Sequence, residues 1–589
     1  MNKKLNHNRL YTAIDLRESG RYKEAQDWLN TFIKSHPKDP EAYSLLSQIL
    51  LLDNKDAESE KTILIAETID SELPSIYLNY ARLLLKKSKN KEALVKAKQG
   101  YDLLPNDPES WLVLAACYGA NNRDQDAYVL IDKVLKVNPK SAEALANRGI
   151  LMLRKKDNLG AIKDLEMALS YKHHLTNIWV LLSSLYYQDN NLPGSIEALK
   201  NALKNEPNNV SYMVKIGQYL REDNRTEEAI NIFQEAIKLD SKNAQINYNL
   251  GIIFHEMDRL DEAKSRYKKT IELNPDFADA HYNLGMVMDR INDLKSAVIS
   301  FQNVLRLDFN DNGLKAGVNL AIYYFLENDF SKSKKILFEV IEILEKKSSN
   351  FINEKIYWKY LSKILSWHEK KCFDAQSDED KNFLYVVGES HSLVSNRLNF
   401  KDLGFDVWCK AKLIKGCKQW HLGNSTNNHY KNKFTSIFSS LPKSSNVLLT
   451  IGEIDCRIDS GIINHKNKYP EKDIKDIISI TIDNYLNYIL MVNNNYQHNI
   501  FIQGVPCPNV DINDYSKKEI KLLIEVIKDF NFLLKNKSKK NGFKFLDVHS
   551  LTDRGDGFSN DIWHIDNYHL SPEGFLELWK RYLFENKNL

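Results

Sequence analysis

The chain has 589 residues, of which 43% are hydrophobic and 27% charged, a composition typical of globular proteins. Its 81 lysines and arginines nearly balance 78 aspartates and glutamates, which disfavours nucleic acid or an anionic membrane as the main partner. The polar N-terminal segment, the lack of a bilayer-length apolar run and six cysteines without a CxxC pair predict a cytoplasmic protein without membrane insertion, structural zinc or disulfides.

Proline recurs with a fixed period in the first half of the chain. The prolines concerned are spaced by 68, 34, 68 and 68 residues, all multiples of 34, at Pro37, Pro105, Pro139, Pro207 and Pro275. Small residues follow the same period, at Ala25, Ala93, Ala127, Ala161, Ala229, Ala263 and Ala297, and at Gly149, Gly217, Gly251 and Gly285. This period predicts two antiparallel helices per repeat, in which the small residues let the helices approach closely and proline ends the second helix.

The clearest single repeat is residues 243–275. It resembles the tetratricopeptide (TPR) family, whose motif positions are occupied here by Tyr248, Leu250, Gly251, Ala263, Tyr267 and Pro275. The resemblance implies an α-solenoid, the TPR superhelix, of about ten helix pairs over residues 1–345, with a degenerate last unit at 312–345 that caps the array or meets the next domain. It also implies a concave groove that holds a protein or peptide segment.

Four asparagines share one position in the first helix of their repeats: Asn79, Asn147, Asn249 and Asn283. In some TPR arrays, notably that of O-GlcNAc transferases, asparagines at this position hold the backbone of a ligand. The resemblance therefore suggests these four as groove residues. The alternative is that asparagine is simply common at this position of the motif.

Residues 346–382 differ in character from the repeats. The segment 357–371 is amphipathic and predicts one more helix, whereas 374–382 is polar and acidic and predicts a linker. His368 and Cys372 are spaced as a helical metal-binding pair would be, but without a second pair nearby we interpret them as surface residues of this helix.

From residue 383 to 589 short apolar segments alternate with amphipathic ones. The apolar segments predict strands at 383–388, 405–411, 447–452, 500–505 and 543–548, and the others predict helices near 391–400, 474–495, 516–540 and 571–585. This alternation predicts a three-layer α/β domain with a parallel, flavodoxin-like sheet covered on both faces. Ligands of such sheets bind beyond the carboxyl ends of the strands, so motifs that follow strands are candidate sites.

Two motifs at opposite ends of this domain carry groups that could work together. GESHS, 388–392, places Ser390 just after the first strand, and DNYHLSPEG, 566–574, places Asp566 and His569 on one face before the last helix. The carboxylate can orient the imidazole, and the imidazole can accept the serine proton. As alternatives, Ser390 caps a helix and His569 is a core residue.

These motifs resemble those of the SGNH (GDSL-like) hydrolase family, with Glu389 where the family usually has aspartate. The resemblance implies Ser390 as nucleophile, His569 as general base and Asp566 as its orienting partner, with no cofactor and no metal. A second D-x-x-H pair, Asp561 and His564, offers an alternative base. His391 and His421 are interpreted as structural or substrate-side residues.

The resemblance also implies an oxyanion hole built from the Ser390 N–H, a glycine, here Gly416, and an asparagine. The family's G-x-N-D run corresponds to residues 452–455, where Ile454 replaces the asparagine. Loss of one such donor can cost about 10²–10³ in rate. Candidate replacement donors are Arg457, Asn424 and Asn509. Residues that could instead bind a polar substrate are Glu453, Asp455 and Arg457.

The sequence thus suggests a serine esterase or acyltransferase, with an acetylated glycan as the substrate class that the resemblance favours. The TPR array would bind a protein partner or the substrate. The alternative is a non-catalytic scaffold in which the C-terminal domain is a degraded binding module, favoured by the missing asparagine. Nothing in the sequence indicates the nucleotide-sugar site of a TPR-fused glycosyltransferase.

Overall fold

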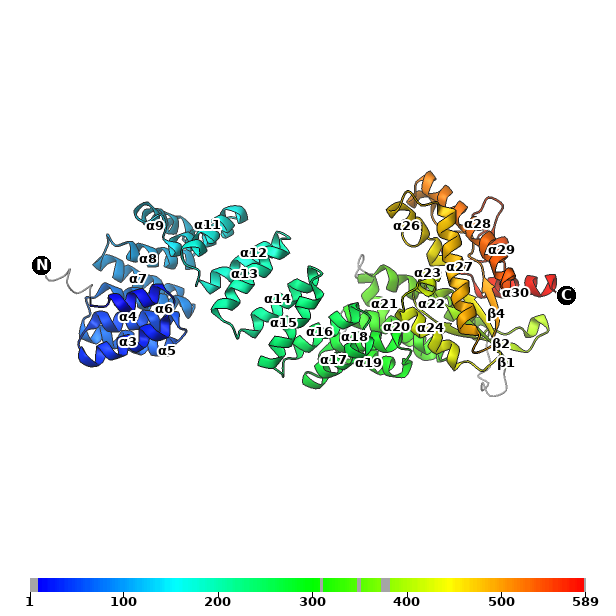
Figure 1. The fold of residues 1–589 in the computed structure, drawn as a ribbon, viewed down its shortest axis with the longest axis horizontal. Coiled ribbons are helices and arrows are strands. Elements are labelled where there is room, and N and C mark those ends of the chain that lie inside the picture. The colour runs from blue at the N-terminus through cyan, green and yellow to red at the C-terminus, as the bar shows by residue number, and fades with distance from the viewer. Residues whose placement is uncertain (1–8, 308–310, 347–350, 372–381, 587–589) are drawn as a thin grey trace. The chain divides into compact units, whose positions relative to one another are not determined.

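The computed structural model describes residues 9–307, 311–346, 351–371 and 382–586. The chain divides into two compact units, Met1–Ser241 and Lys242–Leu589 (Figure 1). Across the described residues, no helix combines the length and the apolar character that crossing a membrane requires.

The first unit consists of consecutive helices that pair with their neighbours. Their bounds are α2 (Tyr11–Glu18), α3 (Tyr22–Ser35), α4 (Pro40–Leu52), α5 (Asp56–Ile69), α6 (Pro74–Lys86), α7 (Asn90–Leu103), α8 (Pro108–Ala120), α9 (Asp124–Val137), α10 (Ala142–Arg154), α11 (Asn158–Tyr171), α12 (Thr176–Gln188), α13 (Leu192–Asn205), α14 (Val210–Glu222) and α15 (Thr226–Leu239). The predicted helix pairs are therefore confirmed.

The turn inside each pair and the break after it both follow from the repeated residues. Asn54, Asn122 and Asn190 occupy equivalent turns with φ of 61°, 59° and 56°, a left-handed conformation that asparagine tolerates better than most residues. At the other end of the pair, α3 ends at Ser35, two residues before Pro37, as a proline-terminated helix should.

The repeated small residues lie where paired helices touch. A Cβ placed on Gly217 of α14 would lie 2.5 Å from Cζ of Phe233, which is fully buried in α15. We expect Gly217→Ala to lower the free energy of unfolding by about 1–2 kcal/mol, because overpacking outweighs the better helix propensity of alanine. Urea unfolding followed by circular dichroism measures this change.

Gly119 of α8 provides the matched control. A Cβ there would meet Leu151 at 3.5 Å, an ordinary contact. Gly119→Ala should therefore leave the stability unchanged or raise it. Equal destabilisation by both substitutions would contradict the close-approach explanation.

The second unit begins with three further helix pairs and one single helix. These are α16 (Ala244–Glu256), α17 (Leu260–Leu273), α18 (Ala278–Arg290), α19 (Leu294–Leu307), α20 (Asp311–Leu326), α21 (Phe330–Lys346) and α22 (Ile352–Lys371). Helix α22 begins five residues before the predicted start. The predicted polar linker at 374–382 and Cys372 lie almost wholly outside the described residues.

His368 is not a surface residue, contrary to the interpretation from sequence. Only 3% of it is exposed, and its ring packs against Phe325 and Phe330 at centroid distances of 5.8 and 4.7 Å. Burial lowers its pKa to about 4. The His368 side chain thus packs α22 against the last repeat.

The remaining chain forms a five-stranded sheet in which all strand pairs are parallel. The strands are β1 (Asn382–Gly388), β2 (Val407–Leu413), β3 (Asn446–Thr450), β4 (Asn499–Gln503) and β5 (Lys544–Leu546), in the order β2-β1-β3-β4-β5. The predicted parallel sheet is confirmed, and its order is the one expected of a flavodoxin-like doubly wound sheet.

Helices and short turns connect the strands. They are η1 (Ser390–Ser395), η2 (Lys401–Leu403), α23 (Gln419–Gly423), α24 (His429–Ser440), α25 (Glu453–Cys456), α26 (Ile462–Lys468), α27 (Ile474–Asn493), η3 (Ile512–Asp514), α28 (Lys517–Lys540), α29 (Val548–Thr552) and α30 (Pro572–Glu585). The helix predicted near 391–400 is only the 3₁₀ turn η1, because the following residues bond to β2: Arg397 N–H donates to the Cys409 carbonyl, and Cys409 N–H donates to that of Leu398.

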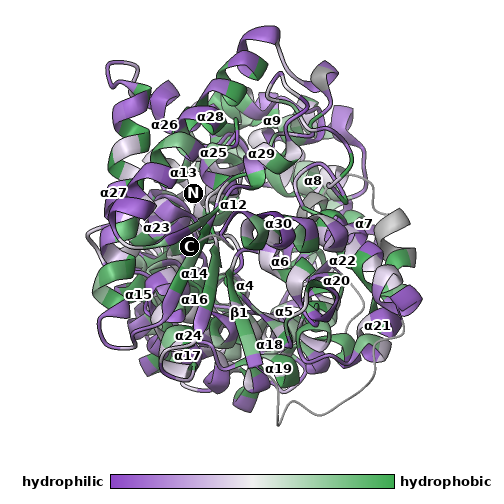
Figure 2. Cartoon of the chain, turned by 90° about the vertical axis from the view of Figure 1, so that its right-hand side faces the viewer, coloured by the Kyte–Doolittle hydropathy of each residue, from purple (hydrophilic) through white to green (hydrophobic). Residues whose placement is uncertain are grey.

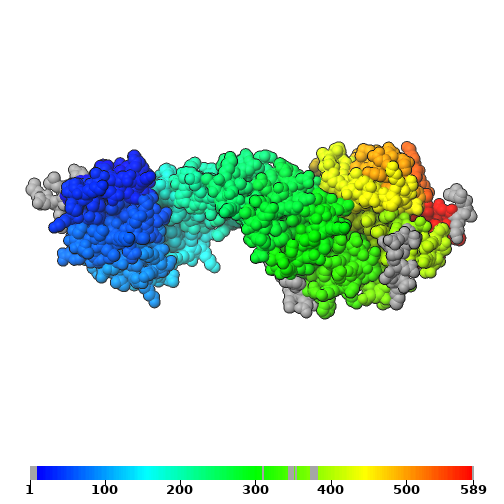
Figure 3. Space-filling view, turned by 90° about the horizontal axis from the view of Figure 1, so that it is seen from below, coloured from blue at the N-terminus to red at the C-terminus, as the bar shows by residue number. Residues whose placement is uncertain are grey.

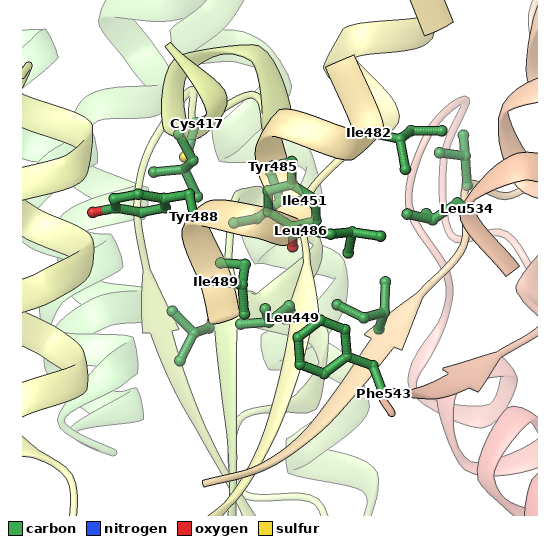
Figure 4. Packing of buried hydrophobic residues seen from close by; sticks show 14 of the residues in the cluster. Cys417, Leu449, Ile451, Ile482, Tyr485, Leu486, Tyr488, Ile489, Leu534 and Phe543 are labelled. Carbon is green, nitrogen blue, oxygen red and sulfur yellow. The ribbon is translucent and has the colours of Figure 1, made fainter. Parts of the chain in front are cut away.

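One face of the sheet is covered by α24, α27 and α28. Figure 4 shows Ile482, Tyr485 and Ile489 of α27 among the side chains packed over β3, where Leu449 is fully buried. Most helices around the sheet carry both hydrophilic and hydrophobic stretches, as expected of helices with one buried side (Figure 2).

The other face is covered by α30 together with the last repeat. Buried residues of α20, α21 and α22 belong to the same hydrophobic cluster as Leu384 and Val386 of β1. Accordingly, the surface of the last repeats in green continues directly into that of the α/β region in yellow (Figure 3). The last repeat and the sheet therefore have a common hydrophobic core.

Candidate functional site

The candidate site lies where the strand order reverses, beyond the carboxyl ends of β1 and β3. Neighbouring strands β1 and β3 are connected to opposite sides of the sheet, and such switch points are the usual ligand sites of doubly wound sheets. Gly388 ends β1 against Thr450 of β3, and a Cβ on Gly388 would clash with the Thr450 side chain. The glycine lets the chain pass directly from β1 into Ser390, the first residue of η1.

The structure brings Ser390, His569 and Asp566 into one chain of hydrogen bonds. The Ser390 hydroxyl lies 2.7 Å from Nε2 of His569, and Nδ1 of His569 lies 2.9 Å from both carboxylate oxygens of Asp566. Ser390 is 7% exposed and His569 is 2% exposed. Such an arrangement can transfer the serine proton to the imidazole and stabilise the resulting imidazolium.

Backbone hydrogen bonds and an aromatic ring hold His569 in place. The Asp566 carboxylate accepts the backbone N–H groups of Tyr568 at 2.9 Å and His569 at 2.8 Å, which fixes the loop before α30. Tyr360 of α22 stacks on the His569 ring, with centroids 3.9 Å apart and planes inclined by 16°. The imidazole is therefore confined between a carboxylate and a buried aromatic ring.

The environment of His569 favours its neutral form, because the net shift of its pKa is downward. Burial lowers the pKa of His569, Asp566 opposes this by raising it, and His391 lowers it further, so the net direction is downward. Burial alone would raise the pKa of Asp566, but His569 and the backbone donors outweigh burial and hold that pKa well below its usual range. A neutral imidazole beside a carboxylate is the state a general base needs.

A buried charged cluster adjoins Ser390 on its other side. His391 Nε2 lies 2.8 Å from the Tyr568 carbonyl, and its Nδ1 lies 3.5 Å from a carboxylate oxygen of Glu389, which is 1% exposed. Burial lowers the pKa of His391, but Glu389 and Glu453 outweigh it, so the pKa is raised. A protonated His391 would balance the charge of Glu389 and connect the turn of Ser390 to the loop that carries His569.

Atom types in the same cluster would also suit a divalent cation. Donor atoms of Glu389, His391 and Glu453 lie within 4.8 Å of one another. However, Arg457 already binds Glu453, with Nη2 2.6 Å from Oε2 and Nε 2.8 Å from Oε1. Because Arg457 and His391 can neutralise the two carboxylates, the cluster needs no cation for charge balance.

Gly416, Arg457 and Asp455, which the sequence assigned to the oxyanion and substrate sites, lie in three different environments. Gly416 is half-buried with φ of 70°, in the turn after β2. Arg457 also lies over the Tyr568 ring, at 4.4 Å from its centroid. Asp455 is 1% exposed and accepts the backbone N–H of Gln419 at 2.7 Å, and burial raises its pKa to about 7. The substrate-binding interpretation of Asp455 is thereby corrected to a structural one.

The two asparagines considered as alternative oxyanion donors, Asn509 and Asn424, have different hydrogen-bond partners. The side-chain amide of Asn509 donates to the Asp566 backbone carbonyl at 3.5 Å. The side-chain oxygen of Asn424 accepts the Thr426 N–H at 3.2 Å within its own turn. Of these two asparagines, Asn509 is therefore the one that contacts a residue of the hydrogen-bonded chain.

The other two candidate histidines, His564 and His421, contact residues other than Ser390. His564, the alternative base, lies 2.8 Å from the Ser559 hydroxyl through Nδ1, and burial lowers its pKa to about 4. His421 accepts the Lys418 N–H at 3.1 Å and stacks on Tyr430 with ring centroids 4.0 Å apart. The structure thus brings His569, rather than either of these, to Ser390.

The four asparagines predicted to face a groove do not form one accessible row. Asn79 is 3% exposed and donates to the Ser44 carbonyl at 2.8 Å, and Asn249 is 6% exposed. Asn283 donates to the Tyr248 hydroxyl at 3.1 Å, and Asn147 is half-buried. The prediction is corrected for Asn79 and Asn249, which pack inside the array.

Sequence reasoning missed the contribution of α22 to the site. Besides Tyr360, this helix places Tyr357 one turn earlier, near Ser390. Burial raises the pKa of Tyr357, Glu389 raises it further, and a side-chain interaction with Ser390 acts in the opposite direction. The tyrosines recur three residues apart on one helix face, but nothing in that pattern indicates which site the face covers.

The helix pairs define the N-terminal part of the chain as an array of TPR repeats. A family model described as TPR repeat matches residues 217–258 and 253–290, and one described as ChAPs (Chs5p-Arf1p-binding proteins) matches residues 8–134. No curated protein matches the chain.

Among solved structures, the chain is similar to MamA, with 25% identity over 27% of this chain and 92% of MamA and a TM-score of 0.26. It is similar to YrrB, described as a TPR protein with an unusual peptide-binding site, with 18% identity over 31% of this chain and 93% of YrrB and a TM-score of 0.27. The C-terminal part of a TPR repeat-containing protein from Cytophaga hutchinsonii has 17% identity over 41% of this chain and 98% of that one, with a TM-score of 0.34.

Proposed function

We propose that the C-terminal region is a serine-dependent acyl-transfer enzyme of the SGNH type, an esterase or an acyltransferase. The observation that carries this proposal is the hydrogen-bonded chain from the Ser390 hydroxyl through His569 to Asp566, at 2.7 and 2.9 Å. It is supported by the motif that places Ser390 directly after β1 and by the motif that carries Asp566 and His569 just before α30. An acetylated glycan is the substrate class that the sequence resemblance favours.

In the proposed reaction, Ser390 Oγ attacks the ester carbonyl carbon while its proton passes to Nε2 of His569. The carbon–oxygen bond to the leaving group then breaks, and His569 returns the proton to the leaving alkoxide, which leaves an acyl group on Ser390. Water in an esterase, or a sugar hydroxyl in an acyltransferase, then attacks the acyl carbon and gives its proton to His569; the bond to Ser390 Oγ breaks, and His569 returns the proton to that oxygen. Asp566 keeps Nδ1 protonated throughout, so that Nε2 can accept a proton.

The oxyanion in this proposal is stabilised by the N–H groups of Ser390 and Gly416. Ile454 supplies no side-chain donor, but Tyr357 lies beside Ser390 and its raised pKa keeps the hydroxyl protonated at neutral pH. A protonated phenol is a hydrogen-bond donor and can replace the missing amide. Asn509, next to Asp566, is the second candidate.

A pocket next to the charged cluster suits the organic part of a substrate. It is a shallow pocket, partly open to solvent, lined by Arg457 and Tyr568 and by apolar residues such as Val505, Val510 and Ile527. Apolar walls with a few polar groups are typical of small-molecule sites. Arg457 and Glu453 therefore stay in the proposed substrate site.

A fluorophosphonate probe, which reacts with activated serines, tests the proposal. We expect the full-length protein to be labelled on Ser390 and Ser390→Ala to be unlabelled, because the hydroxyl beside a neutral imidazole is the reactive group. Gel fluorescence and peptide mass spectrometry measure the labelling.

Ser395→Ala is the matched control. Ser395 lies in the same turn η1 and donates its hydroxyl to the Ser392 carbonyl at 2.7 Å, away from His569. Its labelling should equal that of the unmodified protein. Absence of labelling in folded protein, together with no turnover of short acyl esters, would instead favour the scaffold in which this region only binds.

We further propose that the TPR array binds a protein or peptide. The match to models of TPR repeats and of ChAPs proteins supports this role. This binding role is expected whether the C-terminal region is an enzyme or a non-catalytic scaffold.

A further inference from the structure

A second cavity lies within the second unit, between its repeats and the edge strand β2. It has about 1420 Å³ of space, part of it open to solvent, and is lined by residues of α18, α19, α20, β2 and α24. Its apolar wall contains Val298, Phe301 and Ile322, and its polar wall contains Asn319 and five lysines, Lys412 and Lys415 among them, against the three carboxylates of Asp289, Asp293 and Glu327. The cavity is distinct from the pocket lined by Arg457 and Tyr568.

Two lysines of this cavity lack a carboxylate partner. Among the described residues, no carboxylate oxygen lies within 4 Å of the Lys412 or Lys415 ammonium group, whereas Lys433 at the rim is 2.8 Å from Asp289. Lys415 instead donates to the Asn319 side-chain oxygen at 3.1 Å, and its Nζ lies 4.9 Å from the centroid of the Tyr357 ring. Both lysines are half-buried.

Burial makes these two positive charges unfavourable. Burial lowers the pKa of Lys412, and the charge of the nearby Lys410 lowers that pKa further. Glu327 raises it, but the net shift is downward. Burial also lowers the pKa of Lys415, which Asp289 and Glu354 raise only in part. A buried charge without a partner costs stability, and an anionic ligand in the cavity would remove that cost.

We propose that this cavity binds a phosphorylated small molecule. The ammonium groups of Lys412 and Lys415 would hold the phosphate, for which lysine provides compact positive charge, and the Asn319 amide would supply a further donor. Phe301, Val298 and Ile322 would pack against the organic part. The proposed site requires both the last repeats and the sheet, since each contributes one wall.

The site has a physical connection to Ser390. Lys415 directly precedes Gly416, and its ammonium group lies over Tyr357, which interacts with Ser390. A phosphate on Lys415 would therefore influence the position of Tyr357. Binding in the cavity does not depend on Ser390 being a nucleophile, so this inference and the proposed function can fail separately.

Calorimetric titration of the full-length protein with inorganic pyrophosphate tests the inference. We expect saturable binding, and we expect the double substitution Lys412→Gln and Lys415→Gln to weaken it by at least about tenfold through the loss of two charges. The matched control is Lys518→Gln with Lys521→Gln, two exposed lysines of α28, which should bind as the unmodified protein does. Ser390→Ala should also bind normally.

A single substitution provides a test that does not depend on the double variant folding. Lys412→Met removes one charge that has no carboxylate partner and keeps a side chain of similar length. The variant should therefore have a melting temperature equal to or above that of the unmodified protein, and it should bind pyrophosphate more weakly. The inference is overturned if the unmodified protein does not bind pyrophosphate, if the two double variants bind alike, or if Lys412→Met binds as tightly as lysine does.

Discussion

Replacing His569 by alanine is expected to reduce the turnover of a short acyl ester by about 10⁶-fold, the scale of loss known for removal of a triad histidine. The reason is geometric: Nε2 of His569 is 2.7 Å from the Ser390 hydroxyl and is the group placed to accept its proton. Steady-state hydrolysis of p-nitrophenyl acetate, corrected for the uncatalysed rate, measures the effect. Circular dichroism establishes that the variant is folded.

His564→Ala distinguishes between the two D-x-x-H motifs. His564 is partnered with Ser559 at 2.8 Å rather than with Ser390. The variant should retain turnover within about tenfold, because that histidine does not contact the reacting atoms. If His564→Ala abolished turnover in folded protein while His569→Ala did not, the assignment of the base would be wrong.

Asp566→Asn is expected to lower the turnover by about 10⁴-fold with little change of shape. The carboxylate accepts from Nδ1 of His569 at 2.9 Å and so keeps the proton on that nitrogen. An amide N–H facing Nδ1 would favour the other tautomer, in which Nε2 carries the proton and cannot accept one from Ser390. The rate at saturating p-nitrophenyl ester measures the loss.

The pH profile of the same variant carries a second expected result. In the unmodified protein burial, with His391, places the pKa of His569 below its ordinary value of about 6.5, so the rate should fall only in more acidic solution. Asp566 raises that pKa, so Asp566→Asn should move the acid limb to still lower pH. Asp561→Asn, in the other D-x-x-H pair, should leave rate and profile unchanged, and a shift there would contradict the assignment.

The repeats could be predicted because their fold is repeated in the sequence itself. Gly217 faces Phe233 and Pro37 follows α3 for local reasons that recur every 34 residues, and no distant contact is needed to see them. The parallel sheet was predictable for a similar reason, since each strand is a short apolar run between helices. The length of the turn η1 could not be predicted, because backbone hydrogen bonds from residues 397–398 to β2 end this turn.

The candidate site could be predicted only in part. Ser390, Asp566 and His569 carry recognisable spacing, and the parallel sheet explains why motifs from opposite ends of the domain meet. Contacts from other elements leave no such pattern: the stacking of Tyr360 on His569 depends on how α22 packs. The buried environment of Asp455 depends likewise on the turn before α23.

The hydrophobic cluster common to the last repeat and the sheet limits how this protein can be divided. A fragment starting at residue 383 would lack α20, α21 and α22, and would leave Leu384 and Val386 of β1 in contact with water on that side. It would also lose the aromatic ring of Tyr360 that confines His569. Such a fragment should therefore aggregate rather than fold as an autonomous module, and a truncated protein that is to keep the sheet should begin before α20.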